Sequence, residues 1–143
     1  MVRNSTFFLH ASRPQSNGEL TPLCTGLTET STVVCSTPGH DIWFGSSGSL
    51  LPGYEAKLVS IEGIEITGYD QPGELVVKSP SVVLGYLNND KANRETFQDG
   101  YMRTGDEAVI RKAPSGNEHI FIVDRIKELI KVKVGFHNRS PTP

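Results

Sequence analysis

The chain has 143 residues, which is the length of a single domain with a modest core. Its 14 basic and 16 acidic residues give a formal net charge of −2, and no basic stripe marks a surface for nucleic acid or anionic membrane. No apolar run approaches the ~18 residues of a membrane span, and the apolar segment at 7–9 is too short for a signal-peptide core. The two cysteines, Cys24 and Cys35, make no disulfide framework, so an intracellular location, cytoplasmic or peroxisomal, is expected.

Residues 1–22 are polar and aperiodic, which predicts an irregular tail. After this tail, apolar and polar residues alternate in short runs between turns rich in glycine and proline, a pattern typical of strands with one solvated face. A Pro-Ser-Gly-Asn turn at 114–117 predicts a hairpin between the last two of these runs. The expected strands lie at 54–60, 64–67, 73–78, 107–111 and 119–123, with a short edge piece at 81–84.

A helix is expected at 90–97, with Asn89 or Asp90 as its N-terminal cap. Together with the strands, this single helix predicts an α+β fold that is rich in β-structure. The segment 124–133 (DRIKELIKVK) satisfies both a helical and an alternating pattern, so the spacing leaves its conformation open; its charges also fit a solvated surface segment.

Two features of the segment 40–48 superficially suggest a ligand site, but neither has the spacing that such a site requires. The glycine-serine run at 45–48 superficially suggests a phosphate cradle, but it lacks the lysine and the spacing of such a loop, so it predicts a turn leading into a strand. His40 and Asp41 form a possible metal pair, but no third ligand stands at a zinc-like spacing, which favours a surface loop.

Two short segments carry side chains suited to nucleotide chemistry. The Thr28 hydroxyl can donate to a phosphate oxygen and the Glu29 carboxylate suits a hard cation, although the same pair also fits a capped turn. In Thr104-Gly105-Asp106, glycine permits a tight turn and close approach of a ligand, and the Asp106 carboxylate can accept two hydrogen bonds from a vicinal diol such as that of ribose. The alternative for this tripeptide is an ordinary turn.

Five motifs in order give the chain a family resemblance over about residues 26–133. They are GLTET (26–30), LLPGYEAKLV (50–59), GELVVKSPSVVLGYLNN (73–89), YMRTGD (101–106) and VDRIKELIKVK (123–133). In this order they resemble the adenylate-forming superfamily, and within it the coumarate–CoA ligases, luciferases and other acyl-CoA synthetases. The resemblance implies a two-step ligase: a carboxylic acid reacts with ATP to give an acyl adenylate and pyrophosphate, and coenzyme A then displaces AMP.

The resemblance also assigns roles to individual residues. It implies that Thr28 contacts the ATP phosphates, that Glu29 holds Mg²⁺, and that both act in catalysis. It places Asp106 and Arg125 on the ribose and makes Lys127 the hinge of a C-terminal lid. The remaining assignments are Gly26 and Leu27 to the nucleotide and Lys131 to catalysis. Thr25 stands where the family has an aromatic residue that stacks on adenine.

The resemblance further implies a domain organisation and a function. Residues 1–22 are the tail, 23–123 the distal β-subdomain of an AMP-binding domain, and 124–143 the hinge with a truncated start of the lid. The family's phosphate loop and its C-terminal catalytic lysine are not found, so the expectation is a piece of an ATP-dependent acyl-CoA synthetase that is inactive alone. A non-catalytic nucleotide-binding or assembly module and the product of a truncated gene remain open, as do the acyl substrate and the oligomeric state.

Overall fold

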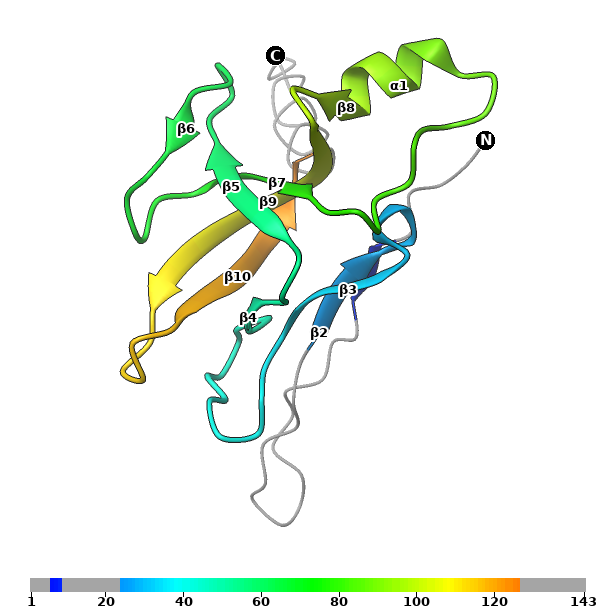
Figure 1. Ribbon diagram of the computed structural model, residues 1–143. Helices are drawn as coiled ribbons and strands as arrows, with labels where there is room; N and C mark the ends of the chain where they lie inside the picture. The colour runs from blue at the N-terminus through cyan, green and yellow to red at the C-terminus, as the bar shows by residue number, and fades with distance from the viewer. Residues whose placement is uncertain (1–5, 9–23, 127–143) are drawn as a thin grey trace, which may run out of the picture.

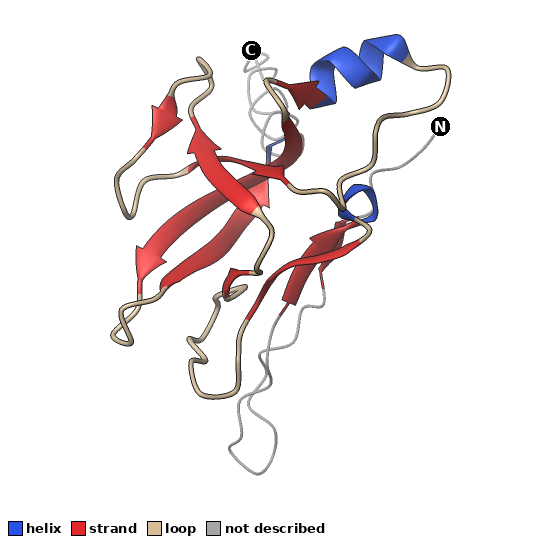
Figure 2. Cartoon of the chain, viewed as in Figure 1, coloured by secondary structure: helices blue, strands red, loops and turns tan. Residues whose placement is uncertain are grey.

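Two antiparallel sheets make up the part of the chain that the computed structural model describes, residues 6–8 and 24–126 (Figures 1 and 2). The first sheet has the order β1 (Thr6–Phe8), β2 (Cys24–Leu27), β3 (Thr32–Ser36), β4 (Ser49–Leu50). The second has the order β10 (Glu118–Arg125), β9 (Tyr101–Lys112), β7 (Gly73–Lys78), β5 (Glu55–Val59), β6 (Glu65–Ile66), and β8 (Phe97–Gln98) also pairs with β9. A 3₁₀ turn, η1 (Thr28–Thr30), links β2 to β3, and the helix α1 (Asp90–Thr96) precedes β8.

The β-rich α+β class expected from the alternation is confirmed, and so are the five strands of the second sheet that it located. The strands β9 and β10 are longer than expected, because β9 begins at Tyr101 and β10 continues to Arg125. Their hairpin closes as expected, with Lys112 opposite Glu118 and the Ala113 amide donating to the Asn117 carbonyl at 2.8 Å. The segment 124–125, which the spacing left open, is therefore strand.

Two expectations for irregular or edge segments are wrong. Within the tail, residues 6–8 form β1 and pair with β2, with Thr6 opposite Leu27; three residues are too few to show an alternating pattern, and their order comes from backbone pairing. The segment 81–84 forms no strand: the Val82 amide closes a turn on the Ser79 carbonyl, and the Val83 amide donates to the Glu29 carbonyl at 2.8 Å. Residues 9–22 of the tail lie outside the described residues.

The core lies between the two sheets, and the 45–48 turn joins them. The Ser47 amide donates to the Ile120 carbonyl at 2.8 Å, and the Ile120 amide donates to the Gly48 carbonyl at 2.9 Å. The turn does lead into a strand, β4, as expected. Apolar side chains from both sheets fill the space between them: Leu27, Val34, Cys35, Leu58, Leu75, Val77, Met102, Ala108 and Ile120.

The helix α1 is capped by Asn89, whose side chain accepts a hydrogen bond from the Ala92 amide at 3.2 Å. Asp90 lies in the first turn, where its charge complements the helix dipole. The helix buries no residue fully and meets the rest of the chain near its C-terminal end, where the rings of Tyr86 and Phe97 lie 5.8 Å apart. None of the helices in the described ranges is long and apolar enough to cross a membrane.

Candidate functional site

The tripeptide Thr104-Gly105-Asp106 is a bulge inside the strand β9, and not the turn that the sequence suggested. Glu107 pairs with Glu74 of β7 and Arg103 pairs with Val76, so the three residues of the tripeptide stand opposite Leu75 alone. Gly105 has φ 74, in the left-handed region that favours glycine. The extra length locally bends the strand and re-aims its side chains.

The threonine of the tripeptide closes the bulge with its hydroxyl. Thr104 Oγ1 donates to the Leu75 carbonyl at 2.7 Å and accepts from the Asp106 amide at 3.1 Å. Both bonds are buried, so losing them would leave polar groups unpaired in the interior. The threonine thus fixes the backbone on either side of Gly105.

Asp106 lies on the core-facing side of β9 together with Met102, Thr104 and Ala108, because burial alternates along the strand. Its side chain is 1% exposed, and Arg125 is its register partner on β10, with Arg125 Nε 3.3 Å from Asp106 Oδ1. Among the described residues, Asp106 Oδ2 has no hydrogen-bond partner. Burial raises the pKa of the Asp106 carboxyl to about 6, because it outweighs the lowering effect of the Arg125 guanidinium.

The structure therefore brings together the two residues that the resemblance assigns to ribose. An acceptor oxygen without a partner, beside a guanidinium that is 29% exposed, fits a ligand that carries hydroxyl donors. A ribose diol has this chemistry, since each hydroxyl can donate one hydrogen bond to a carboxylate oxygen. The orphaned oxygen is buried, which makes an unmade hydrogen bond costly and a fitting donor valuable.

A second group of assigned residues lies around η1. Gly26 and Leu27 are buried at the end of β2 and lead into η1, where Thr28 is exposed and Glu29 is buried. The Tyr86 hydroxyl donates to Glu29 Oε1 at 2.9 Å, and Oε2 has no hydrogen-bond partner in the described ranges. Thr28 and Glu29, but not Gly26 or Leu27, line a pocket of about 490 Å³. The other lining residues come from the segment 83–89 and from α1: Val83, Gly85, Tyr86, Leu87, Asn89, Ala92, Glu95 and Thr96.

The chemistry of this pocket fits a magnesium ion that arrives with a nucleotide. No group of three or more His, Cys, Asp or Glu able to hold a metal occurs in the described residues. Mg²⁺ is usually held by one or two carboxylates together with substrate phosphates and waters, so a single carboxylate oxygen such as Glu29 Oε2 suits it. Asp106 and Arg125 are not among the described residues that line the pocket. Lys127 and Lys131, assigned to hinge and catalysis, lie outside the described residues.

Sequence reasoning missed three polar contacts that build these surroundings. Tyr86 holds Glu29, and Asn93 holds Tyr86 in turn through both the amide and the carbonyl of its backbone. Glu74 contacts the bulge, as described below. The only sequence signal for Glu74 and Tyr86 is their place in the 73–89 motif, because their partners are distant in sequence.

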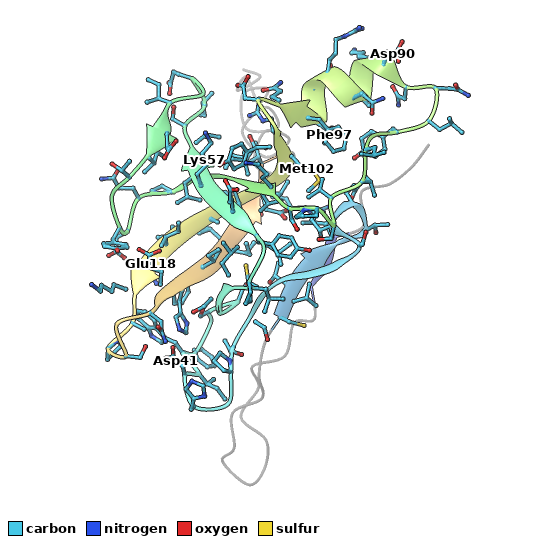
Figure 3. All side chains as sticks on the ribbon, viewed as in Figure 1. Asp41, Lys57, Asp90, Phe97, Met102 and Glu118 are labelled. Carbon is cyan, nitrogen blue, oxygen red and sulfur yellow. The ribbon has the colours of Figure 1, made fainter. Side chains whose placement is uncertain are left out.

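A further feature that sequence reasoning missed is a buried chain of polar side chains at the hairpin end of the second sheet, where Figure 3 labels Asp41. Ser46 Oγ lies 2.9 Å from His119 Nδ1, and His119 Nε2 lies 3.1 Å from Asp41 Oδ2. Asn117 also donates to Asp41 at 2.6 Å, and its hydrogen bond leads the causes that lower the pKa of Asp41 to about 2. Asp41 is thus a buried partner of His119 and not a surface residue; His40 is exposed, as expected.

The Ser46–His119–Asp41 chain resembles a nucleophilic triad in composition only. Ser46 is 1% exposed, and its hydroxyl already accepts from the Gly48 amide at 2.8 Å. The Ser46 hydroxyl is already bonded to the Gly48 amide and to His119, so the arrangement anchors the 41–48 loop to β10.

Comparison with known proteins gives concordant matches. A sequence model described as AMP-binding enzyme matches residues 17–87. The chain is 50% identical over 109 residues to an acyl-CoA ligase of Emericella nidulans, covering 76% of this chain and 19% of that ligase. It is also 50% identical over 122 residues to an acyl-CoA ligase of Purpureocillium lilacinum, covering 81% of this chain and 32% of that ligase.

A solved structure shares the fold. The O-succinylbenzoate coenzyme A synthetase of Bacillus subtilis, in complex with ATP and magnesium ion, superposes with a TM-score of 0.65 and 28% identity, covering 74% of this chain and 22% of that chain. The chain spans about a fifth to a third of the length of these relatives.

Proposed function

We propose, from the premise that the chain belongs to the AMP-binding, adenylate-forming enzyme superfamily, that it supplies the ribose and magnesium contacts of an ATP-dependent acyl-CoA ligase. Its relatives are acyl-CoA ligases, which supports this class of reaction. The observation that carries the proposal is the buried Asp106 Oδ2, an acceptor without a partner in the described chain beside the guanidinium of Arg125.

In this proposal each polar group has one task. Asp106 accepts hydrogen bonds from the ribose hydroxyls, while Arg125 contributes a permanently charged donor next to the same sugar. Thr28 donates to a phosphate oxygen, and Glu29 supplies one carboxylate oxygen to the cation. Bound Mg²⁺ neutralises charge on the phosphates. The co-substrates are a carboxylic acid and coenzyme A, and the compartment is reducing, cytoplasmic or peroxisomal.

The first prediction concerns ribose recognition by the 143-residue chain. Replacing Asp106 with alanine removes hydrogen bonds to a charged acceptor, which are worth about 1.5–3 kcal/mol each, so AMP binding is expected to weaken by roughly 10- to 150-fold for each bond lost. Binding of 2′,3′-dideoxy-AMP, which lacks both hydroxyls, should hardly change. Nuclear magnetic resonance titration with the two nucleotides measures both affinities.

Glu107→Ala serves as the matched control, because Glu107 is the next carboxylate of β9 and lies on the opposite side of the strand. This variant should keep the wild-type preference for the ribose diol. If Asp106→Ala also keeps that preference, Asp106 is only a bulge residue and the ribose assignment is wrong.

We further propose that the chain does not complete a turnover by itself, since it spans only a fifth to a third of its curated relatives. Pyrophosphate exchange with a panel of aromatic and fatty carboxylic acids should therefore show no activity above a no-protein control. Exchange that is saturable in any of these acids, and lost in Glu29→Gln, would contradict this proposal.

A second candidate function, assembly with the remainder of a ligase, is supported by exposed apolar side chains beside the η1 pocket. Leu84 and Leu87 are 105% and 90% exposed, on the segment that also carries Tyr86. Neighbouring exposed leucines of this kind mark surfaces that another protein segment covers. Addition of the complementary part of a related ligase should then restore the exchange reaction that the chain alone lacks.

A further inference from the structure

Glu74, on β7, is the side chain that contacts the bulge from the opposite strand. Its Oε1 accepts a hydrogen bond from the Gly105 amide at 3.2 Å. Its Oε2 accepts from Arg103 Nε at 2.9 Å and also from Arg103 Nη2. The Glu74 side chain is 9% exposed and that of Arg103 is 37% exposed, so these bonds form partly buried, on the side of β7 and β9 that Arg103 leaves open to solvent.

The position of these bonds gives them a specific effect. Arg103 is the last residue that pairs normally before the bulge, and Gly105 is the bulge residue with the left-handed backbone. Because a bulge interrupts the ladder, the amide of Gly105 needs an acceptor outside it, and a buried amide without one is costly. Glu74 supplies that acceptor through Oε1 and at the same time binds the Arg103 guanidinium through Oε2.

Bonds to an ionised acceptor are stronger than neutral ones, and the guanidinium fork adds direction. Thr104 fixes the bulge through its own hydroxyl, and Glu74 fixes the residue on each side of Thr104. The two sets of contacts leave Asp106 as the residue that is turned toward Arg125 on β10.

We propose that Glu74 is a positioning residue for nucleotide binding, which holds the Gly105 bulge in the geometry that points the Asp106 carboxyl at Arg125 and the ribose. This inference rests on the proposed function for the identity of the ligand. Glu74 itself bonds to Arg103 and the Gly105 backbone and acts only through Asp106.

The charge of Glu74 also acts on Asp106. Burial is the main cause of the raised pKa of Asp106, Arg125 lowers that pKa, and the negative charge of Glu74 adds to the increase. Glutamine at position 74 keeps an acceptor oxygen for the Gly105 amide but removes the charge, whereas alanine removes both. The two variants therefore separate the geometric effect from the electrostatic one.

The experiment compares Glu74→Gln, Glu74→Ala and the control Glu107→Gln in the 143-residue chain. Carboxyl carbon resonances report the titration of Asp106, and hydrogen exchange reports protection of the Gly105 amide. Glu74→Gln should lower the pKa of Asp106 and preserve amide protection. Glu74→Ala should lose at least about 10-fold of that protection and a similar factor of the preference for AMP over 2′,3′-dideoxy-AMP. Glu107→Gln should change none of these.

Retention of Gly105 protection and of ribose preference in Glu74→Ala overturns the proposal. If Glu74→Ala does not fold, Glu74→Asp takes its place, because its shorter side chain withdraws the carboxylate from the Gly105 amide: unchanged Gly105 protection and unchanged ribose preference in that variant overturn the proposal. Titration and amide protection need no nucleotide, so they test the positioning role even if the wild type shows no ribose preference, a result that would count against the proposed function alone.

Discussion

Replacing Gly48 with alanine is expected to destabilise the chain by more than about 4 kcal/mol or to prevent its folding. Gly48 has φ 91, and a Cβ there would lie 2.1 Å from the Ser36 carbonyl carbon and 2.4 Å from the Thr37 nitrogen. Ser36 is the last residue of β3 and Thr37 follows it, and backbone atoms of this kind cannot rotate away from an added Cβ. Relief would require the 45–48 turn to leave its place, which breaks the hydrogen bond from the Ile120 amide to the Gly48 carbonyl.

Gly53→Ala is the matched control, because Gly53 has φ 87 and nothing lies within 4 Å of the added Cβ. The Gly53→Ala variant places alanine in the left-handed region without a steric clash, and this backbone strain alone should lower the free energy of unfolding by about 1–2 kcal/mol. Urea denaturation followed through the fluorescence of Trp43, which contacts His119, measures both variants. Equal losses in the two variants would show that the close approach at Gly48 contributes nothing.

The second expected result is a pH-dependent advantage of Asp106→Asn over the wild type. The folded-state pKa of Asp106 is raised from 3.8 to about 6, so the folded chain binds its proton more tightly than the unfolded chain does. Its contribution to stability is complete below pH 3.8 and is lost as the pH rises through 6. The rise of the pKa from 3.8 to about 6 corresponds to about 3 kcal/mol, which is the stability that the chain has lost once the pH is well above 6.

Asparagine does not titrate, so the free energy of unfolding of Asp106→Asn minus that of the wild type should rise by about 2–3 kcal/mol from pH 4 to pH 8. The difference removes the titration of other groups, and Asp41, with its pKa lowered to about 2, titrates below this window. Urea denaturation at four pH values across the range measures it. A difference that stays constant with pH would mean that the Asp106 carboxyl titrates alike in the folded and unfolded chain.

The second sheet could be located from the sequence because short apolar or alternating runs stand between clear glycine and proline turns, with alternation clearest along β9. It could not place Asp106 within a strand. Glycine followed by aspartate signals a turn, and a bulge differs from a turn only through the partner strand, here Leu75 and Glu74. The strand β1 of the first sheet could not be predicted for a similar reason. It has only three residues, too few for a pattern, and it is held by pairing with β2.

Of the candidate site, the chemistry of single residues was predictable and their grouping was not. Asp106 and Arg125 were expected at one sugar through the resemblance, and the β9–β10 register places them opposite each other. The chain of His119 and Asp41 joins residues 78 positions apart, and Tyr86 meets Glu29 across 57 positions. Local sequence patterns do not predict such contacts, because the contacts depend on how distant segments of the chain pack together.

The bulge in β9 also constrains the length of the chain at this point. Three residues oppose one, so the bulge adds an even number of residues, and side chains before and after it remain in phase: Met102 and Ala108 both face the core. An insertion or deletion of a single residue would exchange the two faces from there on, exposing Ala108 and driving Glu107 inward. Single-residue length changes between Arg103 and Glu107 are therefore forbidden to this strand even where substitutions are tolerated.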